Sequence, residues 1–280
     1  MNAPILPPSA QAAQRDGWQA RLALRFAPRT TRTQMVERSR QGPLSVQRGF
    51  YPEGELCHSY ILHPPGGVVG GDQIDITCQL DPQAKALVTT PGATKFYRSL
   101  GAQASQTQTL RVAPGASLEY LPQESIYFSG AQVRMDTQIE LSESSRLIAW
   151  EMHCAGRPVM NEGFEQGSVF ARLQVHLNSQ LIYADHARLG ARFNQASHRN
   201  FAMQSTWIGA WADSDDLQCA RDCLARHQIT AAATLVDGLL VVRALTHSTD
   251  QVLPVWIDLW RALRPSLIGR TACPPRIWNT

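Results

Sequence analysis

The chain has 280 residues, a formal net charge of +3 and 18% charged residues, so it can bury a sizeable core and its composition gives no indication of nucleic-acid binding. No stretch of eighteen apolar residues is present to span a membrane. The six cysteines are scattered and form no C-x-x-C pair, which is typical of buried thiols in a reducing compartment. We therefore expect a soluble, cytoplasmic protein.

The N-terminal part predicts a tail followed by strands. Residues 1–17 are rich in Pro, Ala and Gln and lack the basic start and apolar centre of a secretory signal, so we expect a disordered tail. From Trp18 to Phe26 apolar and polar residues alternate, which predicts a strand with one buried face. The segment from 35 to 46 predicts a short strand, a turn and another strand.

The most distinctive stretch runs from His63 to Asp72 and reads HPPGGVVGGD. Proline fixes φ and glycine permits a positive φ, so this is a shaped loop between two strands. It lacks the G-x-G-x-x-G pattern and a following Lys-Ser/Thr, and an alternating strand rather than a helix comes after it. These features argue against a phosphate-binding loop.

A short apolar strand recurs after small polar turns. Aligning Ala86, Leu118, Leu147 and Leu181 gives steps of 32, 29 and 34 residues, and the strands alternate with longer ones. A period near thirty built from strand pairs predicts stacked hairpins or a coil of strands. An ordinary sandwich with hairpins of similar length is the alternative. Both predict a mainly β fold, and we expect a β-solenoid-like body of helically stacked strands or hairpins over residues 18–192.

Residues 193–280 predict a small C-terminal α+β portion with two helices, packed on the body as one structural unit. Acidic capping residues predict the first helix, and two apolar runs joined at Asp237-Gly238 predict a hairpin. Thr249 or Asp250 is expected to cap a second helix with an apolar stripe.

The sequence carries no catalytic signature. It contains no G-x-S-x-G, no H-E-x-x-H and no two close pairs of zinc ligands. One loose group could hold a transition metal weakly, although its spacing alone favours surface polar residues and a core cysteine. Its members are Glu55, Cys57, His58, His63 and Asp72.

Three further acids lie beside apolar or aromatic residues at strand ends, namely Glu119, Glu124 and Glu151. Such acids are either solvated rim residues or parts of a polar channel, and the sequence leaves both open. From the residues alone, the chain fits a scaffold or a weak metal handler better than an enzyme.

Several long motifs resemble those of the urease accessory protein D family, which is called protein H in some bacteria. The longest is GFYPEGELCHSYILHPPGGVVGGDQIDI at 49–76. The others are LVTTPGATKFYRS (87–99), LEYLPQESIYF (118–128), AGRPVMNEGFEQG (155–167), LRPSLIGR (263–270) and PPRIWNT (274–280). They occur in the family's order, and the resemblance runs from about residue 18 to the C-terminus.

The resemblance implies a chaperone for nickel insertion into urease rather than an enzyme. The implied partners are accessory proteins F and G, of which G is a GTPase, and the urease apoprotein, with neither nucleic acid nor membrane involved. Nickel released on GTP hydrolysis would travel through a tunnel in the D protein, with no tightly bound cofactor and nickel held only in transit. The implied fold is mainly β, with a helical stack of strands and a small pair of helices.

A conduit needs sparse carboxylates and imidazoles facing a wet channel, because tight ligation would trap the metal ion. The candidates for transient nickel contacts are Asp72, Glu55, His63, Glu124 and Glu151. Asp72 comes first, because a glycine-flanked acid at a strand start can face a cavity without crowding. The first four lie inside the matching motifs.

Two other classes of function remain open. A docking scaffold would hold the accessory proteins on urease with no metal passing through it, and a closed apolar core would favour that function. A hydrolase of β-sandwich type would need a Ser or Cys within hydrogen-bond reach of a His in a pocket.

Overall fold

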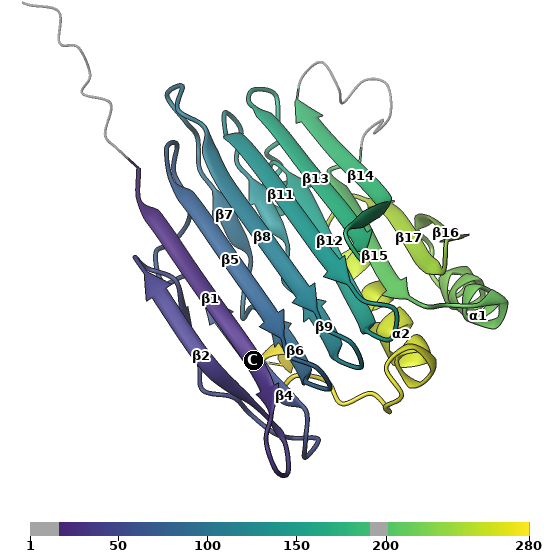
Figure 1. Cartoon of the computed structure of the whole chain (residues 1–280). Coiled ribbons are helices and arrows are strands. Elements are labelled where there is room, and N and C mark those ends of the chain that lie inside the picture. Colours follow the sequence, from purple (N-terminus) through teal and green to yellow (C-terminus); the bar gives the residue numbers. More distant parts are fainter. Residues whose placement is uncertain (1–16, 191–200, 280) are drawn as a thin grey trace, which may run out of the picture.

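The computed structural model describes residues 17–190 and 201–279, so nearly all of the expected tail and the boundary expected at 192/193 lie outside the described residues. Two large sheets lie face to face (Figure 1). The first has seven strands, in the order β14 (Gln180–Gly190), β13 (Ser168–Leu177), β11 (Gln132–Leu141), β8 (Ala104–Val112), β5 (Gln73–Leu80), β1 (Gln19–Pro28) and β2 (Thr33–Gln41).

The second sheet has ten strands. Its main path is β16 (Thr230–Val236), β17 (Leu239–Thr246), β15 (Met203–Ala210), β12 (Arg146–Ala155), β9 (Ser117–Leu121), β6 (Lys85–Thr89), β4 (Cys57–Leu62) and β3 (Ser45–Val46). Two short strands, β7 (Thr94–Phe96) and β10 (Ser125–Tyr127), pair with each other, and β10 also pairs with β12.

The chain passes from one sheet to the other and back, and successive passes stack in parallel. Strands β5, β8, β11 and β13 pair in parallel in the first sheet, and β4, β6, β9 and β12 do so in the second. Each time the chain returns to a sheet, the new strand pairs with the strand of the previous coil. Alternate residues of every strand therefore point into the same core between the two sheets. The expected mainly β, solenoid-like fold is confirmed.

The predicted repeat is right for three of its four residues. Ala86, Leu118 and Leu147 are neighbours in register across β6, β9 and β12. Cys57 is in register with Ala86 and adds an earlier coil, 29 residues before it. The fourth alignment is wrong, because Leu181 lies in β14, which folds back antiparallel on β13 in the other sheet. A tight turn at 178–179 makes a hairpin there instead of another crossing.

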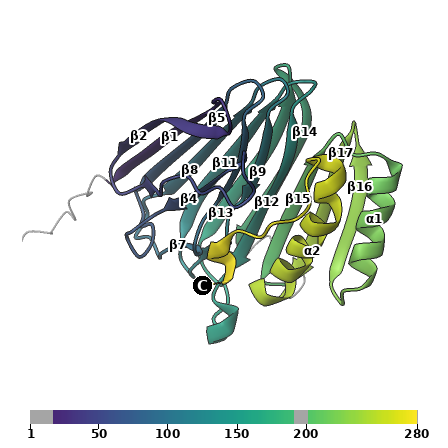
Figure 2. The ribbon, with the colours of Figure 1, turned by 90° about the horizontal axis from the view of Figure 1, so that it is seen from below.

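Two helices, α1 (Ser214–Ala225) and α2 (Thr249–Leu267), cover the outer face of the second sheet near β15, β16 and β17 (Figure 2). One apolar core fills the space between the sheets and a second lies between the ten-stranded sheet and the helices. Alternate residues of β12 therefore serve different cores: Leu147 and Ala149 face the first sheet, whereas Ile148 and Trp150 face the helices.

The local signals of the C-terminal part are confirmed with one adjustment. Asp213 caps α1 through a capping box, and Asp237-Gly238 turns β16 into β17 with both residues at positive φ. The second helix is present, but its predicted cap is wrong: Ser248 occupies the N-cap position, and Thr249 and Asp250 are the first residues of the helix. Among the described residues, no helix has the length and apolar character needed to cross a membrane.

Candidate functional site

A cavity of about 400 Å³ opens between the two sheets at one end of the coil. Two loops line its mouth: residues 63–67, which begin the Pro-Gly stretch, and residues 90–95, which lead into β7. Its inner wall is formed by side chains of β5, β8, β9, β11 and β12. The distinctive loop of the sequence therefore lies at the entrance to a chamber.

Asp72 holds this entrance loop in shape. Its carboxylate accepts hydrogen bonds from the backbone N–H of Val69 at 2.9 Å and of Trp18 at 2.8 Å. His63 lines the mouth, and burial lowers the pKa of its imidazole against the smaller opposing effect of the Asp72 charge. A lowered pKa keeps the ring neutral near physiological pH, and the neutral ring is the form that ligates metals.

The shape of the entrance depends on a close approach at Gly67. A Cβ at this position would lie 2.7 Å from the Lys95 carbonyl oxygen and closer still to the Tyr97 ring. Gly67→Ala is therefore expected to destabilise the protein by about 1–3 kcal/mol, as overpacking does elsewhere. The measurement is the urea midpoint of unfolding. The control is Gly92→Ala at the same mouth, where a Cβ meets nothing within 4 Å; equal midpoints for the two variants would contradict the prediction.

Polar side chains replace the apolar ones deeper in the cavity. Gln108 on β8 and Thr137 on β11 occupy inward positions, are buried, and are adjacent in register. The Tyr120 hydroxyl donates to Gln108, the Gln108 amide donates to the Thr137 hydroxyl at 2.8 Å, and Thr137 donates to Glu151 at 2.5 Å. This chain of hydrogen bonds holds one oxygen of the Glu151 carboxylate in a fixed direction.

Glu151 and His153 stand together on β12 at the inner end of the cavity. The His153 Nε2 atom lies 3.4 Å from a Glu151 oxygen, and the two side chains are 6% and 12% exposed, respectively. The other ring nitrogen, Nδ1, lies 2.8 Å from the Tyr127 hydroxyl. Burial, with a smaller contribution from the Glu151 charge, raises the pKa of Tyr127 well above its usual value, so this hydroxyl keeps its proton. The pair offers a transition metal one carboxylate and one imidazole.

A smaller hollow of about 10 Å³, room for roughly one water molecule, continues past this pair. Glu151 and His153 form part of its wall, and Asp185 and His186 on β14 form another part. The Glu151–His153 pair thus lies between the large cavity and the Asp185 carboxylate, which pairs with Arg243 at 3.0 Å. The His186 side chain is exposed and stacks on Phe170, on the opposite face of β14.

The structure brings together two of the five predicted contacts, His63 at the mouth and Glu151 at the inner end. Asp72 supports the loop instead of lining the cavity. Glu55 is on the surface in ion pairs with Lys85 and Arg270. Glu124 is half-buried outside the lining, although its neighbours Gln123 and Ser125 belong to it.

The loose group around Cys57 does not assemble. Cys57 lies in the inter-sheet core, whereas His58 faces the helices and bonds to Glu53. Within residues 17–190 and 201–279, no three His, Cys, Asp or Glu side chains gather as metal ligands.

Sequence reasoning missed His153, Gln108 and Thr137, although the sequence carries a signal for them. In β8, Gln108 shares its parity with Leu110 and Val112, so a polar residue stands where the pattern requires an apolar one. The same parity places His153 on the face of Glu151. Polar residues at inward positions of adjacent coils indicate a polar interior.

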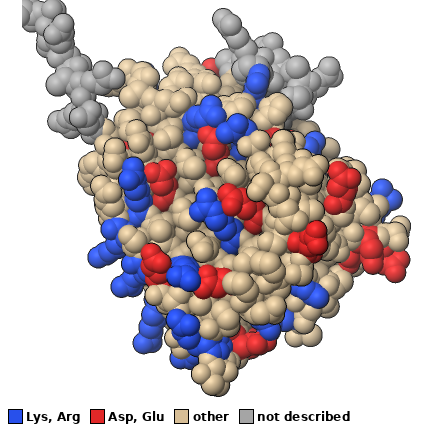
Figure 3. Space-filling view, in the orientation of Figure 1, with Lys and Arg blue, Asp and Glu red and all other residues tan. Residues whose placement is uncertain are grey.

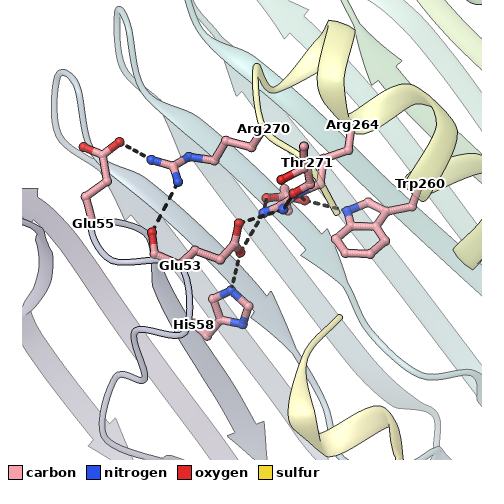
Figure 4. A network of polar contacts seen from close by, with 8 residues as sticks. Glu53, Glu55, His58, Trp260, Arg264, Arg270 and Thr271 are labelled. Carbon is pink, nitrogen blue, oxygen red and sulfur yellow. Dashed lines mark hydrogen bonds and ion pairs between the residues drawn. The ribbon is translucent and has the colours of Figure 1, made fainter. Parts of the chain in front are cut away.

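A second buried polar cluster lies on the other face of the ten-stranded sheet (Figure 4). Arg264 of α2 is fully buried and bonds to two carboxylates, Glu53 at 2.7 and 2.8 Å and Glu119 at 2.9 Å. His58 bonds to Glu53 at 2.7 Å, and the Trp260 N–H donates to Glu119 at 2.5 Å. The two carboxylates of this cluster share one guanidinium, and the cluster joins the entry to β4, strand β9 and helix α2. None of its residues lines the cavity.

The surroundings of Glu53 predict that the protein becomes less stable at acidic pH. Burial alone would raise the pKa of its carboxyl, but hydrogen bonds from His58 and Arg264 and their charges lower it from 4.5 to about 2. Its contribution to stability is then complete above about pH 4.5 and is lost as the pH falls towards 2. The measurement is the urea midpoint of the native protein and of Glu53→Gln between pH 2 and 6. The difference between them should shrink as the pH falls; a constant difference would contradict the prediction.

Comparison with known proteins identifies the family. The family model described as UreD urease accessory protein matches residues 19–279. The chain is 44% identical over 270 residues to the urease accessory protein UreD of an Enterobacter species, covering 94% of this chain and 96% of that protein. It is 43% identical over 265 residues to that of Pseudomonas putida, covering 94% and 95%, respectively. It is 42% identical over 284 residues to that of Klebsiella pneumoniae, covering both chains fully. The chain therefore belongs to the UreD family of urease accessory proteins, whose role is in urease maturation.

Proposed function

We propose that this protein is a cytoplasmic chaperone for nickel insertion and that nickel passes through its inter-sheet cavity on the way to the urease metallocentre. The observation that carries the proposal is the Glu151–His153 pair at the inner end of a cavity of about 400 Å³. Nickel is the cargo here, and the protein needs no resident metal for this function.

Two donors suit transport better than storage. Imidazole is a good ligand for nickel and a carboxylate adds charge, but one of each leaves most of the coordination sphere to water or to the next site. Neutral His63 at the mouth offers a first contact, Glu151 and His153 a second, and the Asp185 carboxylate a third. A metal ion can then exchange ligands stepwise without entering a deep energy well.

The partners follow from the same role. We propose that accessory proteins F and G supply the metal, with GTP hydrolysis by G coupled to its release, and that the urease apoprotein receives it. A scaffold that only docks these proteins would not need buried polar groups between its sheets, because an apolar core stabilises a sheet pair better. The buried Gln108, Thr137 and Glu151 therefore favour passage over docking alone.

The test is urease activation in cells that carry the complete accessory set, with this gene deleted and then restored. Nickel content of the purified urease is measured together with activity. Deletion should leave urease assembled but poor in nickel, and restoration should recover both. A fully metallated, active urease in the deletion strain would overturn the proposed function.

A further inference from the structure

The seven-stranded sheet ends in an open edge at β2. Within the described residues β2 pairs only with β1, and its other side carries backbone N–H and C=O groups with no strand beside it (Figure 1). A bulge interrupts the β1–β2 register, since Arg25 pairs with Glu37 and Phe26 with Met35, leaving Val36 unmatched. The regular part of the edge is therefore 37–41, the length of a short added strand.

This margin is also the most basic part of the chain. Residues 17–50 contain seven arginines and one acid, Glu37, which is a net charge of +6 against +3 for the whole chain. Basic side chains gather along the β1–β2 side in Figure 3. The positive charge is thus concentrated where the sheet is open.

The arginines of β1 are already paired, whereas those of β2 are free. Arg21 bonds to Asp75 at 3.3 Å and Arg25 to Asp81 at 2.9 Å. Arg38 and Arg40 are exposed, and neither forms an ion pair with any residue in the described ranges.

The register places these two guanidinium groups on one face. Arg38 lies opposite Leu24 and Arg40 opposite Leu22, both inward-facing, while Glu37 lies opposite Arg25 on the other face. Alternate residues of a strand are about 7 Å apart, which is also the spacing of alternate side chains on an incoming strand. Charged residues commonly protect an edge from aggregation. Two unpaired arginines at alternate positions of the edge strand also match a partner strand that carries acidic residues at alternate positions.

We propose that β2 is a docking edge for an extended acidic segment of a partner protein, which adds to the sheet as an eighth strand. Backbone hydrogen bonds to 37–41 would hold the segment, and its alternate Asp or Glu side chains would pair with Arg38 and Arg40. This interaction is separate from the cavity and does not depend on nickel passage.

The test uses two labelled eight-residue peptides with the full chain: one alternates Glu with Thr, and the other alternates Lys with Thr. Fluorescence anisotropy should show binding of the Glu peptide only, weakened at higher salt. Hydrogen exchange should show new protection of amides in 37–41. The double variant Arg38→Ser, Arg40→Ser should weaken binding at least 10-fold, whereas Arg221→Ser, at an exposed arginine on α1, should not change it.

A second experiment uses the charge-reversed double variant Arg38→Glu, Arg40→Glu. This variant should bind the Lys peptide more tightly than the Glu peptide. Binding without protection of 37–41 would show general charge attraction and overturn strand addition. Equal losses in the Arg38/Arg40 and Arg221 variants, or no binding of the Glu peptide to the native chain, would overturn the docking site itself.

Discussion

Replacing Glu151 by Gln is expected to lower the nickel content and activity of urease by about 10-fold or more, without unfolding this protein. The amide keeps the volume of the side chain and can still accept the Thr137 hydrogen bond that the carboxylate accepts at 2.5 Å. What is lost is the negative charge and one anionic ligand beside His153. The measurement is nickel per urease active site after activation in cells, with activity alongside.

The matched control for this variant is Glu140→Gln. Glu140 is also on a strand and also accepts a hydrogen bond, from Arg111 at 2.9 Å, but it lies on the solvent side of the first sheet. Nickel content should stay at the native level with this variant. Both proteins should co-purify with urease, which separates metal passage from docking. Full metallation with Glu151→Gln would remove Glu151 from the nickel path and favour the scaffold.

Replacing Arg264 by Met should destabilise the protein more than Gly67→Ala does, by about 3–5 kcal/mol. Arg264 and Glu119 are 0% and 1% exposed, and Glu53 is 8% exposed. Removing the guanidinium leaves two buried carboxylates without their cation, at positions where water cannot replace it. The measurement is the free energy of unfolding in urea at pH 7.

Two further variants test the origin of that loss. Arg111→Met breaks the exposed pair with Glu140 and should cost no more than about 1 kcal/mol. Adding Glu53→Gln and Glu119→Gln to Arg264→Met should recover part of the stability, because the uncompensated charges are then gone. If the triple variant is no more stable than Arg264→Met, lost packing rather than buried charge explains the effect.

Local patterns predicted most elements of this fold, although β15 (Met203–Ala210) was not among the predicted strands. Alternation fixed the strands because one face of each strand must be buried, and the Asp213 cap and the Asp237-Gly238 turn depend only on near neighbours. The repeat residues Ala86, Leu118 and Leu147 also followed from local signals, since each coil presents the same apolar position to one core. The prediction for Leu181 was wrong because a strand that forms a hairpin and a strand that crosses to the other sheet have the same local sequence pattern.

The tertiary structure alone decided which polar residues meet. Glu119 and Glu151 both follow apolar strand residues, yet Glu119 faces α2 and Glu151 faces the cavity, because adjacent strand positions point into different cores. Arg264 finds Glu53 across 211 residues of sequence. The sequence by itself determined most of the strands, both helices and the family motifs. Strand parity places His153 on the face of Glu151, but the cavity that the pair lines depends on how the two sheets stack, which is a long-range property.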